Sequence, residues 1–407
     1  MAITITPMKV EVSQAVLDDL RQRLERTRWP QSFPDMGWDY GTNTEYMREL
    51  VDYWLHKFDW RKQEARINQY PHFKAQVDDV GVHFLHIKGK GPNPMPLLMM
   101  HGYPWSWSTL LRIVPMLTDP VAHGGRAEDA FTLVIPSLCG FCLSDQVPRR
   151  NFGFQDHPAV YRQIMHALGY KKYGIQGGDW GGIITFPWGH QFPEDLIGIH
   201  INYMGNRMGD EVPEDEKSPD LIRGFGLANA PIRPRDPISL RFWKACAKFW
   251  IEQSGYSHVN MTVPQSFAFS VADSPVGAAA WITEKYRLWS DWKEDFEKEV
   301  FSKDEILTNV MLYWINNTFG TSIRIYWESN RRPWSVKPGD RIKVPTGVLS
   351  FPKDIVPLLK ERVEKYYNVV QFRYMEKGGH YGIFEQAEEY SKELRKFFGP
   401  LRNPPAG

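Results

Sequence analysis

Cysteine is scarce in this sequence, and long hydrophobic runs are absent. The 407 residues include three cysteines, Cys139, Cys142 and Cys246, and an odd, low count does not make a disulfide framework. Cys139 and Cys142 form a C-x-x-C pair, but no second pair follows to complete a zinc site, so we expect no metal ion. No run of about 18 apolar residues occurs, and the N-terminus lacks the apolar stretch of a signal peptide. We therefore expect a soluble, cytoplasmic protein with no membrane anchor.

An excess of charge of either sign is also missing. The 49 basic residues almost balance the 48 acidic ones, which leaves a formal net charge of +1. The sequence thus offers no electrostatic basis for binding nucleic acid or an anionic membrane surface. Hydrophobic residues make up 42% of the chain and charged residues 24%, as in ordinary globular proteins, and this length predicts about two or three structural units.

The pattern of apolar residues changes along the chain and predicts four regions. Residues 1–75 are expected to form a helical, irregular meander. In residues 76–205, short apolar runs alternate with helical segments, which indicates a parallel sheet covered on both faces. In residues 206–340, Pro-rich turns and Trp-rich helical segments replace the strands, and strand-like runs return in residues 341–407. The sequence therefore predicts an α/β fold: a mostly parallel central sheet with helices on both faces, an N-terminal meander and a helical lid insertion.

Individual elements are expected at particular places in these regions. The apolar runs predict strands over residues 97–100, 131–135, 173–176, 344–350 and 369–374. Helical spacing predicts helices over residues 44–58, 158–168 and 385–398, and one more helix capped by Ser13.

The segment Gly177-Gly178-Asp179-Trp180-Gly181 is the strongest motif in the chain. It places a central residue between small ones, after a predicted strand and before a helix, as in the nucleophile elbow of the α/β-hydrolase fold. The nucleophile of such an elbow sits on a strained turn, and flanking glycines allow strand and helix to approach it. Here the central residue is aspartate rather than serine. A glycine-rich turn with a capping aspartate is the alternative interpretation.

Two other motifs favour the elbow. His101-Gly102-Tyr103-Pro104 follows the strand at 97–100, where such folds place a loop that supplies an oxyanion-hole N–H. The backbone N–H groups of Tyr103 and Trp180 are our candidate donors. Gly378-Gly379-His380 follows the last predicted strand and precedes the last helix, as expected for a catalytic histidine.

The acid that orients His380 should follow the strand at 344–350. Asp354 lies there, four residues beyond the strand, and is our choice. Glu376 is nearer to the histidine in sequence and is the competing candidate.

An aspartate nucleophile limits the chemistry. A carboxylate attacks amides and esters poorly but displaces a leaving group from saturated carbon, which gives an alkyl ester that water then hydrolyses. Epoxides and alkyl halides are the obvious substrates. An epoxide oxygen needs a proton donor, for which tyrosine is suited, whereas a halide needs N–H donors. Trp180 and Trp105 are the candidates for such a halide site.

The sequence resembles the microsomal-type epoxide hydrolases over nearly its whole length. The motifs described above match that family in order and context, and so does the N-terminal block Leu24-Glu25-Arg26-Thr27-Arg28-Trp29-Pro30. The lid segments around Ser254-Gly255-Tyr256 and Ser322-Ile323-Arg324-Ile325-Tyr326 are similar too. Carried over, the resemblance implies that Asp179 is the nucleophile, that Asp354 and His380 activate water, and that Tyr256 and Tyr326 protonate the epoxide oxygen.

The resemblance implies conversion of a small epoxide to a vicinal diol through an ester on Asp179, with water as the second reactant and no cofactor. Trp105 and Trp107 are bulkier than that family's pattern, and we expect them to contact the substrate. A haloalkane dehalogenase is the alternative enzyme, and a non-catalytic binding protein of the same fold is the alternative outside enzymes. The sequence leaves a homodimer open and does not specify which epoxide is the substrate.

Overall fold

In a computed structural model, residues 3–205, 237–334 and 339–402 are described, and most of them surround one large sheet. The sheet has nine strands in the order β1-β2-β3-β5-β4-β6-β7-β8-β9. The strands are β1 (Thr4–Met8), β2 (His72–Val77), β3 (Val80–Ile87), β4 (Met95–Met100), β5 (Phe131–Pro136), β6 (Tyr173–Gly177), β7 (Leu196–Ile201), β8 (Ile342–Ser350) and β9 (Tyr367–Tyr374). The pairs from β5 to β9 are parallel, and those that join β1, β2, β3 and β5 are antiparallel. The predicted, mostly parallel sheet is therefore confirmed.

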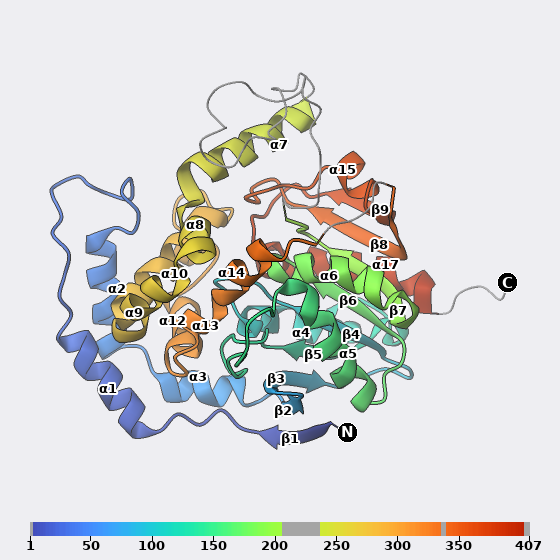
Figure 1. The fold of residues 1–407 in the computed structure, drawn as a ribbon, viewed down its shortest axis with the longest axis horizontal. Coiled ribbons are helices and arrows are strands. Elements are labelled where there is room, and N and C mark those ends of the chain that lie inside the picture. The colour runs from blue at the N-terminus through green and yellow to red at the C-terminus, as the bar shows by residue number, and fades with distance from the viewer. Residues whose placement is uncertain (1–2, 206–236, 335–338, 403–407) are drawn as a thin grey trace.

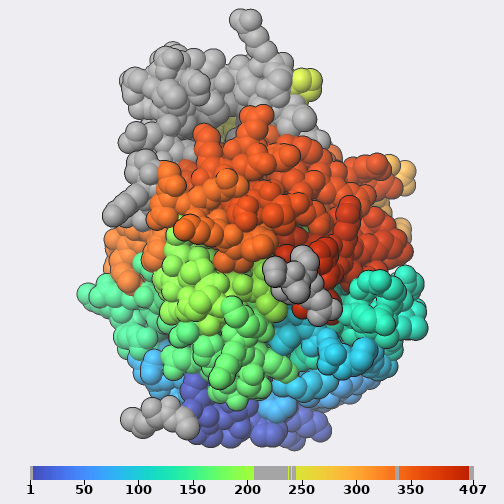
Figure 2. Space-filling view, turned by 90° about the vertical axis from the view of Figure 1, so that its right-hand side faces the viewer, coloured from blue at the N-terminus to red at the C-terminus, as the bar shows by residue number. Residues whose placement is uncertain are grey.

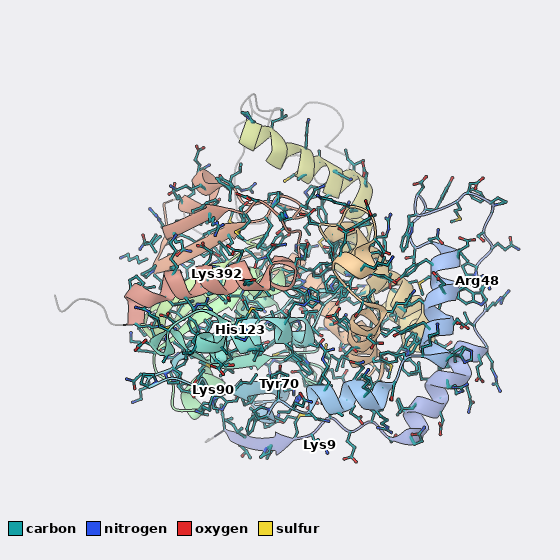
Figure 3. The ribbon with its side chains drawn as sticks, turned by 180° about the vertical axis from the view of Figure 1, so that it is seen from behind. Lys9, Arg48, Tyr70, Lys90, His123 and Lys392 are labelled. Carbon is teal, nitrogen blue, oxygen red and sulfur yellow. The ribbon has the colours of Figure 1, made fainter. Side chains whose placement is uncertain are left out.

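Helices cover both faces of the sheet. One face carries α4 (Val114–Thr118) and α17 (Ala387–Arg402), which contact each other, and the opposite face carries α5 (His157–Ala167) and α6 (Trp180–Gln191). Seen from behind, α17 crosses the sheet and exposes Lys392, one of its polar residues (Figure 3). The buried strands between the two layers are rich in valine, leucine, isoleucine and methionine, as expected when both faces of a parallel sheet are shielded from water.

A group of helices forms the lid; most of them lie to the left of the sheet in Figure 1, with α7 at the top. Its helices are α7 (Pro237–Lys248), α8 (Gly255–Thr262), α9 (Pro264–Asp273), α10 (Pro275–Trp289), α11 (Phe296–Glu299), α12 (Lys303–Trp314), α13 (Phe319–Ser322) and α14 (Arg324–Arg331). Within residues 237–334, no segment forms a strand. The predicted start of the insertion at residue 206 lies outside the described residues.

The N-terminal helices hold the outer side of the lid. They are α1 (Gln14–Glu25), α2 (Thr44–His56) and α3 (Trp60–Ile67), and α2 packs against α10 and α12 of the lid. The Tyr53 hydroxyl of α2 donates to Asp304 of α12 over 2.9 Å, and the Gln63 amide of α3 donates to the same carboxylate over 3.1 Å. The N-terminal meander is thus a brace that ties the lid to the body of the protein.

The structure departs from the sequence predictions at several elements. Strand β1 lies within the region that we expected to be helical or irregular, and β2 begins before residue 76. The alternating sequence Ile3-Thr4-Ile5-Thr6 is a signal for β1 that the helical interpretation missed. Strand β7 was also missed. Ser13 precedes α1 as expected, but its side chain makes no capping hydrogen bond.

The order of the strands brings distant residues together. The N-terminal and C-terminal strands lie at opposite ends of the sheet. In the space-filling view, the N-terminal residues (blue) and the residues after about 340 (orange) accordingly lie at opposite sides of the molecule (Figure 2). Because β4, β6, β8 and β9 are parallel, the loops that follow them meet at one edge, below the lid. No helix among the described residues is long and apolar enough to cross a membrane.

Two short helices lie between β8 and α17 in the chain. They are α15 (Lys360–Glu364) and α16 (Gly382–Glu385), and α16 directly follows the loop that carries His380.

Candidate active site

Asp179 occupies a strained turn between β6 and α6. Its φ is 49°, in the left-handed region that non-glycine residues rarely adopt. The turn is tight: a Cβ on Gly177 would lie 2.2 Å from the backbone carbon of Gly181, and one on Gly181 would lie 2.4 Å from the Met100 carbonyl oxygen. Glycine is therefore required at both positions. The geometry is that of a nucleophile elbow, and the side chain of Asp179 is buried at its tip.

One of the two predicted oxyanion donors contacts the Asp179 carboxylate. The Tyr103 backbone N–H donates to Asp179 Oδ1 over 2.8 Å. This approach depends on Gly102, because a Cβ there would lie 2.3 Å from the same oxygen. The Trp180 backbone N–H, at the start of α6, makes no hydrogen bond to this carboxylate in the described part of the chain, so its donor role stays a prediction.

His380 lies between two carboxylates and is fully buried. Its Nδ1 is 2.8 Å from Asp354 Oδ1, and its Nε2 is 3.2 Å from Asp179 Oδ2. The carboxylate of Asp354 can only accept, so Nδ1 carries the proton in this bond. Glu376 is exposed near the start of the loop after β9 and makes no hydrogen bond to the imidazole in the described part of the chain. The geometry thus brings together Asp179, His380 and Asp354 and leaves Glu376 outside.

The surroundings of His380 favour its charged form. Burial lowers the pKa of the imidazole, but the charge of Asp354 and the hydrogen bonds to Asp179 and Asp354 outweigh burial and raise this pKa to about 10. In this environment the imidazole is held in its protonated form between the two carboxylates.

The two predicted lid tyrosines face Asp179 from above. Tyr256 comes from α8 and Tyr326 from α14, and their ring centroids are 6.0 Å apart. The Tyr326 ring is 4.7 Å from that of Trp180, in an edge-to-face arrangement. Burial raises the pKa of Tyr326 well above its ordinary value, and Tyr256 and the negative charge of Asp179 act in the same direction. Tyr326 therefore keeps its proton and can donate it.

A cleft lies between the elbow and the lid. It holds about 830 Å³ of empty space, including its opening to solvent. Asp179, Tyr256 and Tyr326 all line it, so the carboxylate and both phenols can reach one bound molecule. The other lining residues are mostly apolar: Phe154, Trp180, Ile183, Phe186, Tyr203, Met204, Gly205, Phe249, Trp250, Ser257, Ser329, Trp334 and Val356.

The predicted substrate contacts of Trp105 and Trp107 need correction. Both side chains are fully buried, and neither lines the cleft. Trp107 packs against His72 and His83 beneath the sheet edge, with centroid separations of 5.2 and 5.3 Å. Trp105 packs against Tyr381. Both indoles therefore belong to the buried core. The Trp105–Trp180 pair considered for a halide is likewise not formed around the cleft.

Sequence reasoning missed several residues that lie at the site. Tyr203 lines the cleft, and its ring stands edge-to-face against His380 at 5.2 Å. It follows β7, so recognition of that strand would have placed it at the same edge as Asp179. Phe249 and Trp250, at the start of a π-helical turn (Phe249–Gln253), also line the cleft. The aromatic content of the lid gave no indication of which rings face inwards.

The described residues contain no group of three or more His, Cys, Asp or Glu that could hold a metal ion. Cys139 and Cys142 are both buried, and burial raises the pKa of the Cys139 thiol to about 12. The two cysteines thus lie in a buried turn, where their thiols are neutral and therefore poor ligands for a metal ion.

Comparison with known proteins places this site in a family. Residues 5–110 match the family described as epoxide hydrolase N terminus, and residues 95–200 match the α/β hydrolase fold. Epoxide hydrolase 1 of Sus scrofa is 32% identical, over 98% of this chain and 89% of that protein. Two solved structures are also similar over nearly the whole chain. The juvenile hormone epoxide hydrolase of the silkworm Bombyx mori has a TM-score of 0.80 and 27% identity, with coverage of 99% and 95% of the two chains.

The second structure is the Aspergillus niger epoxide hydrolase, with a TM-score of 0.83, 26% identity, and coverage of 98% of this chain and 97% of that one. As the sequence resemblance predicted, the chain belongs to the epoxide hydrolase family of the α/β-hydrolase fold.

Proposed function

We propose that this epoxide hydrolase opens its substrate with Asp179 and releases a vicinal diol in two half-reactions. The side chains assigned to the reaction are Asp179 as nucleophile, Tyr256 and Tyr326 as proton donors, and His380 with Asp354 as the water-activating pair. No cofactor takes part.

The first half-reaction is a displacement at an epoxide carbon. One carboxylate oxygen of Asp179 attacks that carbon, the carbon–oxygen bond of the ring breaks, and the oxygen takes a proton from Tyr256 or Tyr326. Asp179 needs no base for this step, because a carboxylate is already ionised. The product is an alkyl ester on Asp179.

The second half-reaction hydrolyses the ester. Once Asp179 is esterified it carries no negative charge, so one of the groups that raise the pKa of His380 is lost. His380 can then give up its proton, which restores the phenol that protonated the epoxide oxygen, and it can accept a proton from water while Asp354 holds the imidazole by its 2.8 Å hydrogen bond. Water attacks the ester carbonyl, and the Tyr103 N–H stabilises the oxyanion that forms on Asp179. Collapse of this intermediate breaks the bond between the Asp179 carbonyl carbon and the ester oxygen, and that oxygen takes the proton that His380 accepted from water and leaves as part of the diol.

The observation that carries this proposal is the shared cleft of Asp179, Tyr256 and Tyr326, with His380 on the far side of the carboxylate. Paired phenols are suited to an epoxide oxygen, which leaves as an alkoxide and needs a proton. A haloalkane dehalogenase is not favoured by the comparisons, and only one of its two candidate tryptophans lines the cleft. An intact, buried set of catalytic groups argues against a non-catalytic binding protein.

The apolar lining of the cleft favours an epoxide with hydrophobic substituents. Its partners in the reaction are that epoxide and water. A homodimer and a cytoplasmic location stay predictions of the sequence.

The test is to incubate the purified protein separately with a panel of small epoxides and a panel of haloalkanes. We expect diol release from the epoxides and no halide release. Halide release without diol formation would replace the proposed activity with dehalogenation, and the absence of both products would favour the binding protein.

A further inference from the structure

The loop that carries His380 is held by a buried carboxylate that takes no part in the proposed chemistry. Glu385, at the end of α16, accepts hydrogen bonds from the residues on either side of the histidine. The Gly379 backbone N–H donates to its Oε2 over 2.9 Å, and the Tyr381 backbone N–H donates to its Oε1 over 3.1 Å. The Glu385 side chain thus bridges the backbone on the two sides of His380.

Glu385 also binds the lid. The backbone N–H of Asp291, two residues beyond α10, donates to Glu385 Oε2 over 2.8 Å. In return, the Asp291 carboxylate accepts from the Gly378 backbone N–H over 2.8 Å. The His380 backbone N–H donates to the Trp289 carbonyl over 2.7 Å. The end of α10 and the His380 loop are therefore joined through two carboxylates and one carbonyl.

This arrangement explains the two glycines before His380. A Cβ on Gly379 would lie 2.3 Å from the Trp289 carbonyl oxygen and 3.0 Å from the Asp291 nitrogen, so a side chain there would push the lid segment away. Gly378 has a φ of 109°, which side chains rarely allow. The two glycines thus allow the backbone of the His380 loop to approach the lid segment, and the carboxylates of Glu385 and Asp291 hold the two segments together by hydrogen bonds.

Trp289, at the end of α10, contacts both His380 and the lid residue Tyr256. The Trp289 ring stands edge-to-face against His380, with centroids 5.3 Å apart, and lies 5.1 Å from the ring of Tyr256. A displacement of the His380 loop would move it relative to the lid as well as to Asp354.

We propose that Glu385 is a positioning residue for His380, with Asp291 as its counterpart on the lid side. The assignment rests on the proposed function, because it acts through the base of the second half-reaction. His380 must hold Asp354 through Nδ1 and present Nε2 to the water beside Asp179. Glu385 fixes the backbone on both sides of the imidazole, and the free energy of its three N–H bonds opposes any rotation of the loop.

The experiment replaces Glu385 by glutamine and follows one turnover. Glu385→Gln keeps the side-chain volume but turns one acceptor oxygen into an N–H₂ donor, which faces backbone donors. We expect ester hydrolysis to slow roughly 10- to 100-fold, as for small displacements of a catalytic group, while alkylation of Asp179 changes by less than about twofold. Rapid mixing with an epoxide, acid quenching and intact-protein mass spectrometry measure the two rates separately.

A matched control comes from α17. Glu393 is also a buried glutamate, and it accepts from Gln371 over 2.7 Å and from Arg373 over 2.5 Å, away from the His380 loop. Glu393→Gln should lower the free energy of unfolding without accumulating ester.

On the lid side, Asp291→Ala removes the acceptor of the Gly378 N–H and should also accumulate ester. Asp291→Asn keeps an acceptor oxygen and should restore most of the hydrolysis rate.

The outcomes separate this inference from the proposed function. His380→Gln is run alongside: if it forms no ester, the proposed function fails. If His380→Gln accumulates ester while Glu385→Gln and Asp291→Ala hydrolyse it at the wild-type rate, only the positioning role is overturned. A Glu385→Gln protein that does not fold leaves the decision to the Asp291 pair, and equal slowing of both half-reactions by Asp291→Ala would contradict the inference.

Discussion

At the scale of single residues, His380 shows how surroundings assign a chemical role. Two carboxylates flank one buried imidazole and hold it charged in the resting enzyme. The ester that forms on Asp179 removes one of these charges and so converts the same imidazole into a base. The order of the two half-reactions follows from this change of charge, since His380 has no function as a base until Asp179 has reacted.

His380→Gln should therefore block only the second half-reaction. Glutamine cannot remove a proton from water, but Asp179 needs no base to attack the epoxide. We expect a covalent adduct with the mass of protein plus substrate, visible by intact-protein mass spectrometry. If substrate is neither bound covalently nor turned over, then His380 is needed earlier than the proposed function assigns it.

Tyr256 and Tyr326 should contribute to the first half-reaction. Tyr256→Phe or Tyr326→Phe should slow alkylation, by roughly 10²-fold where one donor dominates, since an alkoxide then leaves with less help. The double variant should be almost inactive. Circular dichroism checks that folding is intact, and single-turnover formation of the adduct gives the rate. Near-normal turnover in the double variant would remove both phenols from the mechanism.

At the scale of elements, the turn between β6 and α6 forces Asp179 into its strained conformation. The turn is possible because β4, β6 and α6 approach within the distance that glycine alone allows. The strain is offset by the packing of the central strands on both sides.

Gly181→Ala should therefore destabilise the protein. The new Cβ would lie 2.4 Å from the Met100 carbonyl oxygen, and relief of such a contact costs roughly 1–3 kcal/mol in a packed core. Gly255→Ala, where nothing lies within 4 Å of the added Cβ, is the matched control and should change stability by less than about 0.5 kcal/mol. Urea unfolding measures both. Equal stability of the two variants would show that the elbow can relax.

The sequence identifies the elements around the site more reliably than the contacts within it. The elbow at Asp179 and the loop at His380 follow from motif spacing, because both are tied to the ends of parallel strands. The spacing of residues in the sequence does not show which aromatic rings face the cleft, because the orientation of a ring depends on the conformation of the loop that carries it. Trp105 and Trp107 were expected there and are core residues, whereas Tyr203 was not expected and lines the cleft. Glu385 has no signal in the sequence beyond its place after the histidine.

At the scale of the whole molecule, the pH dependence of stability should reveal the charge of His380. Its pKa is about 10 in the folded protein, against the ordinary value of 6.5, so the folded state binds the proton more tightly. This stabilisation is fully present below pH 6.5 and is lost as the pH rises from 6.5 through 10.

We expect the difference in free energy of unfolding between wild type and His380→Gln to fall over this interval, by at most about 1.4 kcal/mol per pH unit. Taking the difference cancels the contribution of other buried groups. Chemical unfolding at several pH values measures it, and a difference that does not vary with pH would mean that His380 is neutral in the resting site.

The central claim is that Asp179 bonds to the substrate carbon. The alternative is that His380 activates a water that opens the epoxide directly while Asp179 supplies only charge. The two routes place the oxygen of water differently. The Tyr103 N–H, which donates to the Asp179 carboxylate in the resting site, is also placed to stabilise an oxyanion that forms there.

A single turnover in ¹⁸O-water distinguishes the routes, with mass spectrometry of the peptide that contains Asp179 and of the released diol. The ester route predicts one ¹⁸O in the Asp179 carboxylate and a diol that carries an unlabelled oxygen from the enzyme. A labelled diol together with an unlabelled Asp179 would contradict the proposed mechanism.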